Sequence, residues 1–235
     1  MQLWRTPILL LMVAAQACLA GADAAPPTTR AQPADETLVG HLAAMKQINC
    51  METLFVCEKR LAALDTPLVS SGTIWIRSPD SVRFTTNKPY LSDLILHDGQ
   101  VLSRNQHDKR WVRNPQATRP GLAAVMGQMA KWSLGETQSM RDAYDIIHAN
   151  AEVPPLPSGR SELGVGKTAC FTLKPRDEAV AVAVRSILLI VDEDSHCLRV
   201  VRIVTAQGDQ TTYWFDRIQL NAKLPADAFA PEDVK

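Results

Sequence analysis

The sequence lacks an excess of charge of either sign. Its 235 residues include 25 Lys and Arg and 25 Asp and Glu, so the formal net charge at pH 7 is zero. Proteins that bind nucleic acid or anionic membranes carry a basic excess, and we therefore expect neither kind of partner. Apolar residues make up 46% of the chain, which is enough to build the core of one large domain.

The sequence also lacks an apolar run long enough to cross a membrane. The run from Ile8 to Ala20 is shorter than the roughly 20 residues that a spanning helix needs. Arg5 precedes this run and the small residues Ala22-Asp23-Ala24 follow it as a cleavage site. This pattern predicts that residues 1–24 are a signal peptide and that the chain is exported.

No arrangement of residues that could carry catalysis is found. The run Gly164 to Thr168 is similar to the end of a phosphate-binding loop, but the pattern requires glycine where Ser161 stands. There is no G-x-S-x-G motif, and the acidic run 192–194 is expected to be a solvated turn rather than a calcium loop. None of the histidines pairs with another at metal-ligand spacing; they are His41, His97, His107, His148 and His196. We therefore expect no enzyme activity, no cofactor and no metal.

Export leaves an even number of cysteines, which suggests disulfides in an oxidising compartment. The candidates are Cys50, Cys57, Cys170 and Cys197. Cys50 and Cys57 are about 10 Å apart in a helix and about 23 Å in a strand, too far for a bridge, so at least one long-range disulfide is expected. Four buried free thiols are the alternative. A further alternative is lipidation at Cys18, although Ala15 stands where lipoprotein processing usually requires leucine.

The stretch from Ser71 to Leu102 is predicted to form an antiparallel meander. Apolar residues alternate with polar ones in three short runs, 73–77, 81–86 and 91–96. Proline breaks separate the runs, and the last one ends at Asp98-Gly99, a strong hairpin signal. Because such short connections force neighbouring strands to be antiparallel, this stretch forms a sheet with one apolar face.

Further strands and helices are predicted on both sides of this meander. A loop is expected from Leu61 to Gly72, a linker-like loop over 153–159, and strand or a helical turn over 179–184. An N-terminal helix is indicated by Leu38, Leu42, Met45 and Ile48. The other strands are expected at 52–61, 101–104, 110–113, 143–149, 169–173, 186–191, 198–205 and 211–218.

Between these strands, apolar residues recur at helical spacing before Gly135. They are Leu122, Val125, Met126, Met129 and Trp132. The spacing predicts an amphipathic helix, and its methionines can adapt to irregular partners. On spacing alone, this apolar stripe favours a simple core contact over a binding surface.

The order of these features resembles that of the periplasmic outer-membrane lipoprotein carriers, the LolA-like family. The resemblance rests on a glycine, an alternating strand, a proline, an aromatic strand, a second proline and an aliphatic strand that ends in Asp-Gly. In this sequence these positions are Gly72, Ile74, Ile76, Pro79, Phe84, Pro89, 94–96 and 98–99. A Phe171 to Pro175 strand, a Gly208-Asp209 hairpin and a tail with Asn221, Leu224, Phe229 and Pro231 extend it. The loop before Gly72 looks most like the branch of the family that accompanies lipid exporters.

This resemblance implies an α+β fold, in which a curved antiparallel sheet forms an unclosed β-barrel and helices cover its concave face. We expect a disordered lead-in over 25–34 and a single lipid-carrier domain over 35–235. The predicted function is a monomeric periplasmic carrier that takes a lipoprotein or another lipid from an inner-membrane exporter to an outer-membrane acceptor. The acyl chains are expected to contact Ile74, Ile76, Val82, Phe84, Leu94, Leu96, Leu122, Val125, Met126, Met129 and Trp132.

Two alternatives remain, and one family feature differs. The same fold serves an envelope-stress sensor that binds a regulatory protein, and a hydrolase with an unrecognised site is the other alternative. In the carriers, an arginine before the first proline holds the lid helices shut, but here Ser78 stands there. Arg77 is expected to face solvent, because successive strand side chains point to opposite faces, and Arg83 is also expected to be exposed. How the lid is held is therefore open.

Overall fold

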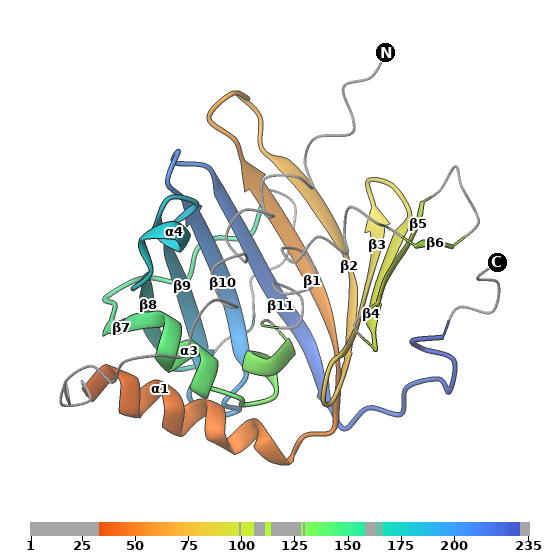
Figure 1. The fold of residues 1–235 in the computed structure, drawn as a ribbon, viewed down its shortest axis with the longest axis horizontal. Coiled ribbons are helices and arrows are strands. Elements are labelled where there is room, and N and C mark those ends of the chain that lie inside the picture. Colours follow the sequence, from red (N-terminus) through yellow and green to blue (C-terminus); the bar gives the residue numbers. More distant parts are fainter. Residues whose placement is uncertain are drawn as a thin grey trace.

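The computed structural model describes residues 33–98, 100–105, 111–113, 128, 130–157, 164 and 166–230. These residues form one antiparallel sheet of eleven strands (Figure 1). The strands are β1 (Cys50–Arg60), β2 (Leu68–Arg77), β3 (Ser81–Lys88), β4 (Ser92–His97), β5 (Gln100–Asn105), β6 (Val112–Arg113), β7 (Tyr144–His148), β8 (Thr168–Pro175), β9 (Val184–Asp192), β10 (Leu198–Thr205) and β11 (Gln210–Leu220). The helices are α1 (Pro33–Ala43), the 3₁₀ helix η3 (Ala44–Gln47), α3 (Gln138–Ala143) and α4 (Glu178–Ala181).

The strand order is β6-β5-β4-β3-β2-β1-β11-β10-β9-β8-β7. The chain winds outward from β1 to β6, continues at the opposite edge with β7, and winds back to β11, which pairs with β1. The two edge strands β6 and β7 each pair on one side only within the described residues. The sheet is therefore unclosed, and its fold class is the one expected from the sequence.

Most strands lie where the alternation of apolar residues predicts them, but the start of β2 does not. Residues 68–72 were expected to belong to a loop, and the structure shows that they form the first half of β2. They pair with β1 in a regular register that joins Lys59 to Leu68 and Cys57 to Ser70. The long β1 strand supplies these partners, so pairing overrides the weak strand preference of two serines.

The helices match the sequence predictions in part. The N-terminal helix is present as α1 and η3, and it begins at Pro33, within the expected disordered lead-in. The 179–184 segment contains α4 and then the start of β9. Helical residues 130–133 lie at the end of the predicted amphipathic helix. The predicted signal peptide 1–24, residues 25–32, Gly99 and residues 106–110 lie outside the described residues.

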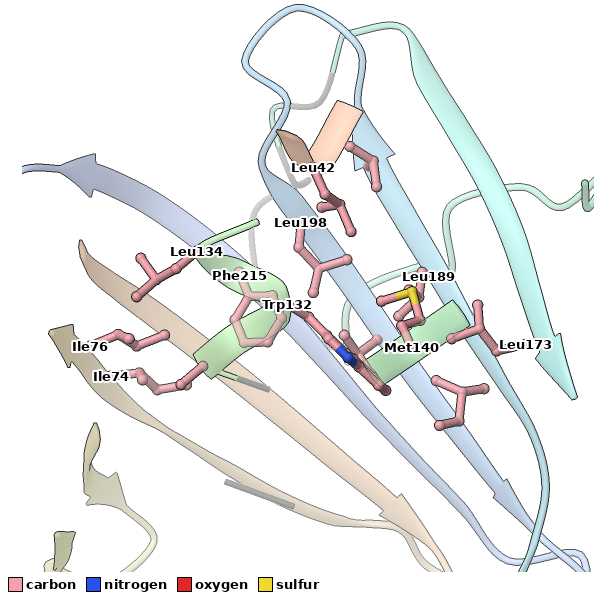
Figure 2. Packing of buried hydrophobic residues seen from close by; sticks show 14 of the residues in the cluster. Leu42, Ile74, Ile76, Trp132, Leu134, Met140, Leu173, Leu189, Leu198 and Phe215 are labelled. Atoms are coloured by element: carbon pink, nitrogen blue, oxygen red, sulfur yellow. The ribbon is translucent and has the colours of Figure 1, made fainter. Parts of the chain in front are cut away.

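Apolar side chains cover both faces of the sheet. On the face that we call the inner face, α1, α3 and residues 130–133 lie over the strands (Figure 1). The largest core cluster lies there, with Leu38 and Leu42 of α1 and Met140 of α3 at 0%, 1% and 0% exposure. Figure 2 shows side chains from several strands around Trp132 in this cluster.

The opposite face, the outer face, carries two smaller clusters. Residues 149–157 pack over Cys170, Ile190, Val200 and Trp214, and the Trp214 Nε1–H donates to the Pro154 carbonyl at 2.9 Å. The segment predicted to be linker-like is therefore packed against the sheet over 153–157. The C-terminal tail covers β2, β4 and β5 through Ala228 and Phe229, which are 1% and 3% exposed. None of the helices in the described part of the chain is both long and apolar enough to span a membrane.

Candidate functional site

The candidate site is an apolar pocket between the inner face and the segments that cover it. Its cavity volume is about 20 Å³, room for about one water molecule. The lining residues come from strands of both halves of the sheet, from η3 and from residues 130–133; they are Met45, Met51, Thr53, Ile74, Ile76, Val82, Phe84, Ala130, Ser133, Leu198, Phe215 and Ile218. In this conformation the pocket is closed and nearly filled by its own side chains.

Strand alternation places the sequence-predicted residues of the meander side by side on the inner face. Ile76 pairs with Val82, and Ile74 pairs with Phe84. On the next strand, Leu96 is opposite Val82 and Leu94 is opposite Phe84. These directly opposed side chains form a continuous apolar ladder across β2, β3 and β4. Their part in lipid binding remains a prediction.

Gly72 brings β3 close to β2 beside this ladder. A Cβ atom at this position would lie 1.8 Å from the carbonyl oxygen of Thr85 and 2.9 Å from the Cα of Thr86. The register between the two strands shifts next to Gly72, between Ser71 and Gly72. Only glycine allows the two strands to come this close. Gly72, one of the positions on which the family resemblance rests, therefore has a structural role in this protein.

The cover is made by η3 and by the segment 130–135. Met45 and Ala130 are 3% and 1% exposed and close the pocket on the side opposite the strands. Trp132 is 3% exposed, and its ring meets that of Tyr144 edge-on at 6.0 Å between centroids. Its Nε1–H has no hydrogen-bond partner in the described part of the chain. The other residues of the predicted amphipathic helix that were expected to contact lipid lie outside the described residues; they are Leu122, Val125, Met126 and Met129, of which Leu122, Met126 and Met129 are predicted to cover the cavity.

Gly135 fixes the cover against α1. Its backbone has a left-handed φ of 81°, which glycine adopts without strain. A Cβ there would lie 2.2 Å from the Leu42 carbonyl oxygen and 2.9 Å from the Lys46 nitrogen. The 130–135 segment therefore passes directly over the end of α1. If the pocket opens, this segment and α1 either move together or lose this contact.

Sequence reasoning missed the half of the pocket that β1, β10 and β11 supply. Met51 and Thr53 on β1 and Phe215 on β11 line the same cavity as Ile74 and Ile76. The alternation of β1 was visible in the sequence, with Met51, Thr53 and Phe55 all on one face. What the sequence did not reveal is that β1 and β11 are neighbours, because this pairing is between distant segments.

Two arginines that were expected to face solvent are partly covered instead. Arg77 lies over the ring of Phe229 at 4.8 Å and donates to the Pro225 carbonyl at 3.5 Å. Arg83 lies over the rings of Trp75 and Trp111 and donates to the Ala228 carbonyl at 3.1 Å. Both point away from the pocket, as strand alternation requires, but the C-terminal tail covers that face. The prediction of exposure was wrong for this reason.

Asp93 is the centre of a charged cluster on the outer face. Its carboxylate accepts hydrogen bonds from Thr85 at 2.6 Å, from Arg83 at 3.2 and 3.3 Å and from Arg104. Burial alone would raise the pKa of Asp93, but these hydrogen bonds and the two guanidinium charges together lower it. The open hollow of about 450 Å³ beside the cluster is lined by the same groups, which are already engaged with one another.

Ser78 does not reach the cover. It stands where the carriers have the arginine that holds the lid helices shut, which we call the latch arginine. Ser78 is exposed at the turn after β2, and its backbone N–H donates to the Asn49 carbonyl at 2.8 Å. Instead, α1 is held by an ion pair between Asp35 and Arg141 of α3 at 2.9 Å. A second link joins His41 of α1 to His196 of the β9–β10 turn, with 3.1 Å between their Nδ1 atoms.

No disulfide joins the four described cysteines, so the expected long-range bridge is not found. The Cys50 thiol donates to the Ala222 carbonyl and that of Cys170 donates to the Ala151 carbonyl. Burial raises the pKa values of the Cys57, Cys170 and Cys197 thiols, which lowers the fraction of the reactive thiolate form. Within the described residues, no three His, Cys, Asp or Glu side chains form a metal-binding group.

The C-terminal strands of the sheet carry a match to a known protein family. Residues 161–232 match the model of the family described as outer membrane lipoprotein carrier protein LolA. A search of curated protein sequences gives no match. Among solved structures, the complex of Pseudomonas aeruginosa MucA and MucB is 19% identical, with 84% of this chain and 60% of that chain covered and a TM-score of 0.40.

The alignment with this chain covers two further solved structures almost completely. A LolA superfamily protein from Nitrosomonas europaea is 8% identical, with 85% of this chain and 99% of that chain covered and a TM-score of 0.40. A conserved protein from Thermus thermophilus is 10% identical, with coverages of 84% and 94% and a TM-score of 0.48. The chain spans only about three-fifths of the MucB chains that it matches. Through the family match over residues 161–232, the chain resembles the outer membrane lipoprotein carriers of the LolA family, as its sequence predicts.

Proposed function

We propose that this chain is a periplasmic carrier that holds the acyl chains of a lipoprotein or another lipid between its sheet and its cover. The observation that carries the proposal is the continuous apolar ladder on the inner face, over which η3 and the 130–135 segment lie. A carrier of this kind needs no catalytic group. Its donor would be an inner-membrane exporter and its acceptor an outer-membrane component.

The closed pocket requires that the cover move before a lipid enters. An acyl chain of eight methylenes gains about 6 kcal/mol at about 0.8 kcal/mol per buried CH₂, before the cost of ordering. A cavity of about 20 Å³ cannot hold such a chain. The lipid would therefore take the place of Met45 and Ala130 against the strands, and the structure corresponds to the closed conformation.

Trp132 supplies a polar group that suits an acyl ester or amide. Its indole N–H is buried in the inner cluster and lacks a partner in the described part of the chain. Leaving a buried donor unpaired costs about 1–3 kcal/mol. Trp132 does not line the pocket, so a carbonyl oxygen of a bound acyl group would accept this hydrogen bond only if opening of the cover extends the cavity toward Tyr144.

Native mass spectrometry of the protein from a periplasmic extract tests the proposal first. A bound species that releases diacyl or triacyl chains on denaturation is the expected result, and its head group would identify the class of cargo. A mass of the protein alone, without uptake of added lipid or lipopeptide, would contradict the proposal. That outcome would favour the alternative of a regulatory protein that binds another protein through the same fold.

The substitution Phe84→Asn is expected to weaken lipid retention by about tenfold or more. Phe84 lines the pocket but is only partly buried, so the sheet is expected to remain folded. The amide would lose its water contacts when lipid covers it, at a cost of about 1–3 kcal/mol, and each 1.4 kcal/mol is tenfold in affinity. Retention is measured by the fraction of lipid-bound protein in the mass spectrum.

A matched control replaces an apolar residue outside the pocket. Val112→Asn changes an edge-strand side chain that is 47% exposed, and we expect it to leave lipid retention unchanged. The cover prediction is tested in parallel by Met129→Asp, which should abolish retention. Equal retention in the Phe84 and Val112 variants would show that the acyl chains lie elsewhere.

A further inference from the structure

Two histidines link α1 to the β9–β10 turn, and each contributes its Nδ1 atom to the contact. His41 and His196 are 155 residues apart in the sequence, and their Nδ1 atoms lie 3.1 Å apart. The rings are tilted by 44° with their centroids at 5.3 Å. Two neutral imidazoles can share one proton at this distance, and an ion that displaces this proton can contact both Nδ1 atoms at once.

The distance fits a transition metal ion well. Zinc binds histidine nitrogen at about 2.0–2.1 Å, so two nitrogens 3.1 Å apart would make an angle of about 100° at the ion. This angle lies between the square-planar and tetrahedral values that imidazole-bound divalent ions adopt. Little movement of either ring would be needed for binding.

The turn that carries His196 is built to hold the ring in place. His196 has a left-handed φ of 57°, which is uncommon for residues other than glycine. Asp192 stabilises this turn, because its Oδ1 accepts hydrogen bonds from the Ser195 N–H at 2.8 Å and the Ser195 hydroxyl at 2.9 Å. The ring is therefore preorganised toward α1 rather than free on a flexible loop.

We propose that His41 and His196 form a binding site for a divalent transition metal ion such as zinc, with water molecules as the remaining ligands. The sequence did not suggest this site, because the two histidines come from distant segments that only the fold brings together. An ion bound there would join α1 to the sheet. If the proposed carrier function holds, this link would fasten the cover in place of the missing latch arginine.

The test is a calorimetric titration of the lipid-free protein, prepared without a histidine tag and treated with chelator, with zinc chloride. One ion per chain is expected to bind, and binding should weaken by at least tenfold in both His41→Gln and His196→Gln. His148→Gln is the matched control, because His148 is exposed on β7 and contacts the Phe171 ring rather than another histidine.

A thermal melt provides a second measurement, since an ion that binds only the folded state raises the melting temperature. Zinc should raise the melting temperature of the parent protein and of His148→Gln, but not that of His196→Gln. Absence of zinc binding by the parent protein, or unchanged binding in both His41 and His196 variants, would overturn the proposal. Both results are independent of lipid uptake, so a failure of the metal site and a failure of the carrier function can be distinguished.

Discussion

Gly72→Ala is expected to lower the free energy of unfolding by about 3 kcal/mol, at the upper end of the range for overpacked sites. The new methyl group would lie 1.8 Å from the Thr85 carbonyl oxygen. This neighbour is backbone, so it cannot move aside as a flexible side chain could, and β2 and β3 would have to separate. Urea unfolding measures the change through a lower transition midpoint.

Gly40→Ala is the matched control for this substitution. Gly40 lies within α1, and a Cβ there would meet nothing within 4 Å. Alanine is favoured over glycine inside a helix by about 1 kcal/mol, so this variant should be slightly more stable than the parent. If Gly72→Ala unfolds at the same urea concentration as the parent protein, this result would contradict the close approach of β2 and β3 at Gly72.

Asp93→Asn is expected to cost about 3 kcal/mol, which is typical when one partner of a buried charged cluster is removed. The side chains of Asp93 and Arg83 are 8% and 18% exposed, and Arg104 is 38% exposed. An amide would leave two guanidinium groups beside each other without this counter-charge. The control is Asp145→Asn, whose partner Arg176 is exposed, and we expect a change of at most about 1 kcal/mol there.

The same carboxylate gives the protein a definite response to acid. Because the pKa of Asp93 is lower in the folded protein than its ordinary value of 3.8, the unfolded chain binds its proton first as the pH falls. The contribution of Asp93 is therefore present above about pH 4 and is lost as the pH falls through the folded pKa. The stability difference between the parent and Asp93→Asn should shrink over this range in unfolding experiments at about pH 7, 4 and 2.5. A difference that stays constant would contradict the assignment.

The sequence predicts the inner face of the sheet well, and the reason is local. In β2 to β4, alternation and proline breaks act over a few residues, so the positions of Ile74, Val82 and Leu94 follow from the pattern itself. The same reasoning placed Arg77 and Arg83 correctly on the opposite face. It could not say what covers that face, because the tail that packs there begins more than one hundred residues later.

The candidate site was predictable only in part for a similar reason. The pocket is shared between the meander and strands β1, β10 and β11, which meet it through the pairing of β1 with β11. The contact between His41 and His196 also depends on how α1 lies across the sheet. Periodicity identifies which residues face inward, but distant pairing decides which inward residues meet.

The pairing of β1 with β11 also bears on how the protein folds. Each half of the sheet, β1 to β6 and β7 to β11, is built from neighbours in the sequence, and such local contacts form quickly because they close short loops. The seam between the halves joins distant parts of the chain, as in the pairs of Met51 with Leu220 and Arg60 with Gln210. Two preformed half-sheets would therefore dock along this single pair of strands, and the inner pocket would come into existence only at that last step.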